Sequence, residues 1–171
     1  MRFVAVKSGD DITLLAKMAK EIWLEYWPDR IGLAQTQYMI EKYQSAQAIT
    51  QAIGDEGYLY YMLAHGEEFV GYTGVCIEED SQRLFVSKLY LYKDQRGKGY
   101  ATKTIRLLEQ LCKEHGLTAI YLSVNKYNDL AICAYQGNGF VIVDSMETPI
   151  GSGFVLDDYL MEKPLLNQQR T

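Results

Sequence analysis

Apolar and polar positions alternate along the chain with two different periods, and each period predicts one kind of element. Between residues 14 and 26 apolar side chains recur at the three- and four-residue spacing of an amphipathic helix. Runs rich in β-branched and aromatic residues predict strands, because such side chains suit a pleated surface. The run 119–124 is almost wholly apolar, which suits the interior of a sheet.

These patterns predict a series of helices and strands with short connections. The expected helices cover residues 8–27, 33–43, 46–53, 98–115 and 128–136. The expected strands cover residues 2–7, 58–64, 69–77, 84–92, 119–124, 140–145 and 154–161. Residues 8–11 (Ser8–Asp11) offer capping side chains for the first helix, and Ser45 can cap the third. Gly54 is expected to end a helix, and Thr148–Gly151 to separate the last two strands. The order of elements indicates an α+β fold with a central, mostly antiparallel sheet.

Length and composition favour one domain. The chain has 171 residues, 48% of them hydrophobic, so a single domain over residues 1–171 with a sizeable core is expected. With 17 basic and 22 acidic residues the formal net charge is −5. This balance gives no electrostatic support for a nucleic-acid partner or an anionic membrane, and it suits a positively charged substrate better.

The cysteines do not have the spacing of a metal site. Cys76, Cys112 and Cys133 are accompanied by only two histidines, so no metal is expected and the three are predicted to be buried free thiols. The first apolar stretch is too short for a signal peptide, and no run has the length of a membrane span. A cytoplasmic location without a membrane partner is therefore expected.

An anion site is predicted where an apolar strand runs into a basic glycine-containing loop and then into a helix. The stretch Leu89–Ala101 reads LYLYKDQRGKGYA. The first turn of a helix carries N–H groups without intrahelical partners and a partial positive charge, so a phosphate fits there. Gly97 and Gly99 allow close approach of the backbone to an anion. Formal positive charge comes from Arg96, Lys98 and Lys103.

Two common glycine motifs do not match this loop. A P-loop needs Ser or Thr after its Gly-Lys pair, whereas Lys98 is followed by Gly99. A dinucleotide fingerprint needs a third Gly or Ala where this chain has Thr102. It also needs an acidic residue about twenty positions later, where residues 120–124 are uncharged.

The loop does match another pattern. Arg96–Ala101 follows the Arg/Gln-x-x-Gly-x-Gly/Ala signature of the GNAT superfamily of acyl-CoA-dependent N-acyltransferases. A second segment, Asn128–Tyr135 followed by Gly139 and Phe140, resembles the family pattern Asn-x-x-Ala-x-x-x-Tyr-x-x-x-Gly-Phe. The chain thus resembles this superfamily over roughly residues 58–163, by motifs and by order of elements.

The resemblance implies a fold and an activity. The fold would be a GNAT-like central, mostly antiparallel β-sheet flanked by α-helices on both faces. A helical block on the acceptor side would cover about residues 8–54, and the cofactor-binding core about residues 84–140. The activity would be transfer of the acetyl group of acetyl-CoA to a primary amine, by direct transfer in a ternary complex. The acceptor would be a small polyamine-like molecule or an amine of a protein or peptide.

The resemblance also implies the contacts of coenzyme A. The backbone at the end of the strand before the loop would receive the pantetheine arm like a further strand. The loop would hold the diphosphate, Asn128 would hydrogen-bond the amides of the arm, and the small Ala131 would leave room for it. These cofactor-binding residues are Leu89, Tyr90, Leu91, Arg96, Gly97, Lys98, Gly99, Tyr100, Ala101, Thr102, Asn128 and Ala131.

Tyr135 is the predicted general acid. It shares one helical face with Asn128 and Ala131, at spacings of seven and four residues. Coenzyme A leaves as a thiolate, whose thiol form has a pKa of about 8.5. A well-placed phenol, with a pKa of about 10, can protonate this thiolate. A backbone N–H near Leu91 would serve the thioester oxygen. The base stays open, because Ser87 stands where some relatives have Glu. The candidates are Glu21, Glu25, Asp157 and Asp158.

Other interpretations of the same residues stay open. Asn128 can be a helix cap, Tyr135 a core aromatic, and Gly139 a C-cap glycine. Cys133 lies off the face of Asn128 and Tyr135, so a covalent route through it is not expected. A non-catalytic acyl-CoA-binding or sensing module and a purely structural protein are the alternative functions. The sequence leaves monomer and homodimer equally open.

Overall fold

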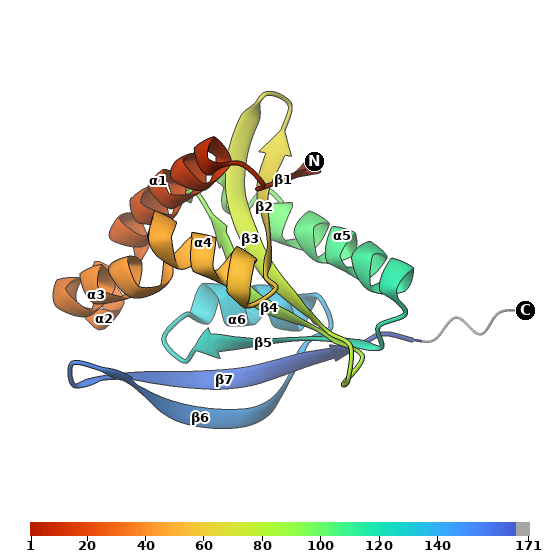
Figure 1. The fold of residues 1–171 in the computed structure, drawn as a ribbon. Helices are drawn as coiled ribbons and strands as arrows, with labels where there is room; N and C mark the ends of the chain where they lie inside the picture. Colours follow the sequence, from red (N-terminus) through yellow and green to blue (C-terminus); the bar gives the residue numbers. More distant parts are fainter. Residues whose placement is uncertain (167–171) are drawn as a thin grey trace, which may run out of the picture. The chain divides into compact units, whose positions relative to one another are not determined.

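The computed structural model describes residues 1–166, whose elements follow the expected order with two short additions, α2 and η1 (Figure 1). The helices are α1 (Gly9–Tyr26), α2 (Pro28–Ile31), α3 (Leu33–Tyr43), α4 (Ala46–Asp55), the 3-10 turn η1 (Lys93–Gln95), α5 (Tyr100–His115) and α6 (Asp129–Gly137). The strands are β1 (Arg2–Ala5), β2 (Leu59–His65), β3 (Glu68–Glu78), β4 (Arg83–Leu91), β5 (Ala119–Asn125), β6 (Val141–Gly151) and β7 (Phe154–Pro164).

The strands form a seven-stranded sheet in the order β1-β2-β3-β4-β5-β7-β6. The pairs β1–β2, β2–β3, β5–β7 and β6–β7 are antiparallel, whereas β4 and β5 run parallel. Strands β6 and β7 form a long hairpin, drawn in blue in Figure 1. The expected α+β fold with a mostly antiparallel sheet is confirmed.

The chain divides into two compact units by the contacts among its own residues. Unit 1 comprises residues 1–76 and 88–101, and unit 2 comprises residues 77–87 and those from 102 onward. The single domain expected over residues 1–171 stays a prediction, and its last five residues lie outside the part of the chain that is described.

The core of unit 1 forms where α1 and α4 pack on β2 and β3. Its side chains are almost completely buried, and each large one contributes about 1.5–3 kcal/mol to folding. They are Val6, Leu15, Met18, Ala19, Ile22, Ile49, Ala52, Tyr60, Met62 and Tyr72.

Serine caps begin α1 and α4, one at Ser8 within the range 8–11 that the sequence offered and one at the predicted Ser45. The Ser8 hydroxyl accepts a hydrogen bond from the Asp11 amide at 3.1 Å, and the Asp11 carboxylate accepts one from the Ser8 amide at 2.9 Å. This reciprocal capping box begins α1. The Ser45 hydroxyl accepts from the Ala48 amide at 3.2 Å and begins α4.

The first helix ends at Tyr26, with Trp27 as its C-cap, close to the expected end. Pro28 then opens the short helix α2, which was not predicted, because a proline at the first helical position loses no intrahelical bond. Two local expectations are wrong. Gly54 lies inside α4. Thr148–Gly151 does not separate the last strands, since β6 continues to Gly151. Strand β6 stands at the edge of the sheet, where a proline is tolerated, and the turn is made by residues 152–153, which have positive φ.

The expected burial of the cysteines is correct only for Cys112. Cys76 is half-buried and Cys133 is exposed. Burial raises the pKa of the Cys112 thiol to about 12, which keeps this thiol unreactive. Within residues 1–166, no helix combines the length and the apolar character that crossing a membrane requires.

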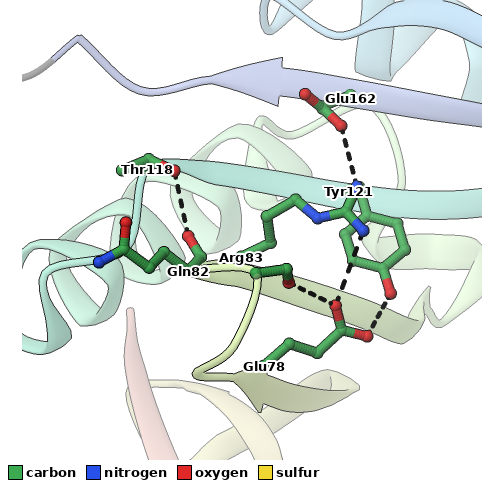
Figure 2. Close-up of polar contacts among 7 residues, drawn as sticks. Glu78, Gln82, Arg83, Thr118, Tyr121 and Glu162 are labelled. Atoms are coloured by element: carbon green, nitrogen blue, oxygen red, sulfur yellow. Dashed lines mark hydrogen bonds and ion pairs between the residues drawn. The ribbon is translucent and has the colours of Figure 1, made fainter.

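A polar cluster of unit 2 anchors the connection between β3 and β4 (Figure 2). The Arg83 guanidinium lies between two carboxylates, 3.9 Å from Glu78 and 3.3 Å from Glu162. The Tyr121 hydroxyl donates a hydrogen bond to Glu78, and the centre of the Tyr121 ring lies 4.2 Å from the Arg83 guanidinium carbon. These side chains join the end of β3 and the start of β4 to β5 and β7.

Gly71 allows β3 to approach the end of β4 closely, and its replacement tests this packing. A Cβ added there would lie 2.1 Å from the Tyr90 carbonyl oxygen and 2.9 Å from a Leu91 methyl group. Because backbone cannot move aside cheaply, we expect Gly71→Ala to lower the free energy of unfolding by about 2–3 kcal/mol. Urea denaturation measures this loss.

Gly54→Ala is the matched control. This glycine lies in α4, and apart from its chain neighbours and the helix's own backbone no heavy atom of the described residues comes within 4 Å of an added Cβ. We expect the free energy of unfolding to rise by about 0.5 kcal/mol, since alanine is the better helix former. A Gly71→Ala protein as stable as wild type would contradict the close approach.

Candidate functional site

The predicted anion loop lies in unit 1, between β4 and α5. After β4 the chain makes the turn η1 and reaches two glycines in the left-handed region, with φ of 75° at Gly97 and 81° at Gly99. A side chain is strained in this conformation, so both positions favour glycine. The structure therefore gives a physical reason for Gly99, which the motif contains, and for Gly97, which stands at one of its variable positions.

The face of this loop is open. Apart from the chain neighbours of each glycine, no heavy atom of the described residues lies within 4 Å of a Cβ built on Gly97 or Gly99. Tyr100, in contrast, is 7% exposed and packs with Leu63 and Val70, which determines where α5 begins. Accessible backbone at the start of a long helix, beside the exposed Lys98, fits the diphosphate of coenzyme A.

The Arg96 side chain contacts α1 and the end of β4. One of its terminal nitrogens lies 2.7 Å from Glu25 Oε2 on α1 and donates a hydrogen bond to the Leu91 carbonyl at 3.1 Å. Its guanidinium carbon lies 4.7 Å from the centre of the Tyr26 ring. Its role as a ligand of the cofactor stays a prediction.

The segment Leu89–Leu91 forms the end of β4. The parallel register of β4 with β5 covers residues 83–86, so this segment follows the last residue of that register. The Tyr90 ring packs 5.4 Å from Trp23 and 5.6 Å from Tyr72, measured between ring centres. The Tyr90 ring thus lies against side chains of α1 and β3.

The second motif lies in unit 2 and forms α6 with its cap. The Asn128 side-chain oxygen accepts a hydrogen bond from the Ala131 amide at 3.3 Å, so Asn128 is the helix cap that the sequence allowed. Asn128 and Tyr135 are each 8% exposed, and the Tyr135 ring lies 5.5 Å from the Phe140 ring. Burial raises the pKa of the Tyr135 phenol.

The remaining predicted contacts lie at the start of α5, where Ala101 and Thr102 are half-buried. The structure thus places the loop and the end of β4 together in unit 1. Thr102, Asn128, Ala131 and Tyr135 belong to unit 2.

The four candidate bases have different environments. Glu25 is paired with Arg96, and Asp157 lies 2.6 Å from the Lys126 ammonium. Glu21 accepts a hydrogen bond from the Tyr92 hydroxyl at 3.0 Å. Asp158 is half-buried, and desolvation together with the charge of Asp157 raises its pKa to about 6.

One ionisable group of β4 was not singled out from the sequence. Lys88 on β4 is half-buried, with its ammonium 5.3 Å from the centre of the Tyr60 ring and 5.7 Å from that of the Tyr58 ring. Desolvation lowers its pKa to about 8. A signal for this lysine was present in the sequence. Leu84 and Val86 are buried on one face of β4, and Lys88 is the next residue on that face.

Comparison with known proteins agrees with this arrangement. A sequence model of the acetyltransferase (GNAT) family matches residues 17–140, well over half of the chain. The uncharacterized N-acetyltransferase YycN of Bacillus subtilis (strain 168) is 28% identical over 89 residues. That match spans 51% of this chain and 57% of the relative, so the chain spans little more than half the length of the curated relative it matches.

Solved structures share the fold. The PaiA N-acetyltransferase of Thermoplasma acidophilum, in complex with coenzyme A, superimposes with a TM-score of 0.77 at 19% identity, covering 96% of this chain and 100% of that one. The spermidine N-acetyltransferase of Vibrio cholerae, in complex with CoA and spermine, gives a TM-score of 0.67 at 18% identity, covering 95% and 94%. With its family match, its α+β sheet and its open glycine loop, the chain belongs to the GNAT family of acetyltransferases.

Proposed function

We propose that this protein transfers the acetyl group of acetyl-CoA to a primary amine by direct transfer in a ternary complex. The observation that carries this proposal is the open glycine loop at the start of α5, in a member of the GNAT family. Acetyl-CoA supplies the acetyl group as a thioester, from which coenzyme A departs as a thiolate.

The loop residues are the proposed ligands of the diphosphate. Backbone amides of Gly97–Ala101 donate hydrogen bonds to it, and Lys98 adds positive charge. The segment Leu89–Leu91 lies along the pantetheine arm in this proposal. Asn128 and Ala131 contact the arm, as the family resemblance implies.

Tyr135 is the proposed general acid. Because burial raises its pKa, the phenol stays protonated through the neutral range and donates a hydrogen bond to the departing sulfur. The phenol gives its proton to the thiolate and regains one from solvent. Its raised pKa makes complete transfer less favourable, so the hydrogen bond to sulfur supplies much of the stabilisation.

Asp158 is the proposed base. The other three candidate carboxylates already accept a hydrogen bond or form an ion pair, whereas a pKa of about 6 suits a group that takes a proton from an ammonium near neutral pH. The Asp158 carboxylate takes the proton of the amine and releases it to water, which leaves the nitrogen lone pair available for attack.

A small polyamine-like amine is the first acceptor to test. The neighbour from Vibrio cholerae binds spermine, and the net charge of −5 favours a cationic acceptor. An amine of a protein or peptide is the second.

The burial of Tyr135 favours a different function, a non-catalytic acyl-CoA-sensing module. The assay that follows separates this function from acetyl transfer.

Release of free thiol from acetyl-CoA across a panel of amines tests the activity and the acid together. We expect wild type to acetylate at least one primary amine. Tyr135→Phe should lower kcat by about 10²-fold with little change in the KM for acetyl-CoA, since it removes a proton donor but keeps the ring. Coenzyme A binding without acetylation of any amine would favour the sensing module, and absence of binding would contradict both functions.

The pH dependence of the rate tests Asp158. Since the carboxylate accepts a proton only when ionised, we expect kcat to rise with pH up to about 6 and then to level. Asp158→Asn should lower kcat by about 10²-fold and abolish this limb. Asp80→Asn, in the exposed β3–β4 turn, is the matched control and should leave the profile unchanged.

The stability of Asp158→Asn shows whether a loss of activity comes from the missing base or from unfolding. The pKa of Asp158 is higher in the folded protein than the ordinary aspartate value of 3.8, so its ionised form opposes folding at neutral pH. Asp158→Asn should therefore be more stable than wild type at pH 7, by on the order of 1 kcal/mol after solvent screening, with no difference below about pH 4. A variant with an unchanged pH–rate limb would exclude Asp158 as the base.

A further inference from the structure

The Arg96 side chain is held by three groups of unit 1. The same terminal nitrogen lies 2.7 Å from Glu25 Oε2 and 3.1 Å from the Leu91 carbonyl oxygen, and the guanidinium stands over the Tyr26 ring. The Arg96 side chain is 20% exposed, and that of Glu25 is 32% exposed. A planar guanidinium with these partners has a defined position.

A second contact joins the same two segments one helical turn earlier. The Tyr92 hydroxyl donates to Glu21 Oε2 at 3.0 Å. Glu21 and Glu25 lie four residues apart on α1, and Tyr92 and Arg96 lie four residues apart in the segment that follows β4. Helix α1 is thus joined at two points to the segment that leads into the glycine loop, with η1 between the points.

These contacts change what Arg96 can do for an anion. A carboxylate 2.7 Å away offsets most of the guanidinium charge, so little net charge remains for a phosphate. The hydrogen bond to the Leu91 carbonyl closes residues 91–96 into a ring through the side chain. That ring sets the direction of the backbone immediately before Gly97.

We propose that Glu25 is a positioning residue, which holds Arg96 against the Leu91 carbonyl and thereby sets the glycine loop for coenzyme A. Arg96 itself does not bind the phosphates, which are bound by the loop amides and by Lys98. This inference rests on the proposed function, because it concerns the same cofactor loop.

Titration calorimetry with coenzyme A tests the inference. Glu25→Gln should weaken binding about tenfold and raise the KM for acetyl-CoA, with kcat at saturation little changed. Arg96→Gln keeps an amide that can donate to the Leu91 carbonyl, and the family motif also contains Gln at this position. We expect its affinity to stay within about threefold of wild type, with the same dependence on salt.

The controls separate positioning from stability and from charge. Glu41→Gln, an exposed glutamate of α3, should bind coenzyme A like wild type. If Arg96 bound phosphate directly, Arg96→Gln would flatten the salt dependence, and Glu25→Gln would tighten binding by releasing the guanidinium. Either result overturns the inference, as does a Glu25→Gln protein that binds like wild type.

The failure of the inference is distinguishable from that of the proposed function. If wild type binds coenzyme A and the variants bind it with the same affinity, only the positioning role is contradicted. A wild-type protein that binds no coenzyme A would remove the proposed function and the positioning role with it. Urea denaturation of Glu25→Gln shows that the variant is folded at the temperature of the titration, and the Arg96→Gln salt series stands independently of that variant.

Discussion

Burial of Tyr100 against Leu63 and Val70 determines where α5 begins, and the geometry of the anion loop depends on that point. The first amides of a helix bind an anion only where the helix start is held still and remains open to solvent. Here Tyr100 holds one end of the loop and Arg96 the other. The three residues between them, Gly97, Lys98 and Gly99, are exposed. The loop thus combines a rigid frame with an accessible centre.

The electrostatics of the loop follow from the same arrangement. In a protein with a net charge of −5, an anion site cannot rely on a large basic patch. Glu21 and Glu25 would repel a phosphate, but each accepts from a partner, Tyr92 or Arg96. Oriented backbone amides then attract the phosphate. Because these dipoles are already in place, binding the phosphate requires little reorganisation of the protein.

Much of the fold could be predicted because its signals are local. Helix α3 has the bounds that its periodicity predicted, and the two serine caps stand where an oxygen side chain precedes an apolar run. The errors have equally definite causes. Helix α2 is one turn long, which is too short to show a periodicity. Strand β6 continues through Pro149 because, on the outer side of an edge strand, the N–H that proline lacks is not needed for pairing.

The candidate site divides in the same way. The sequence by itself determined the order of strand, loop and helix and the two glycines, and it offered the cap at Asn128 as one interpretation, because each depends on backbone preferences over a few residues. Tertiary structure alone decided the partner of Arg96, 71 positions away, the raised pKa of Asp158 and the lowered pKa of Lys88. Charge pairing and desolvation depend on which distant residues meet when the chain folds, and no local pattern carries that information.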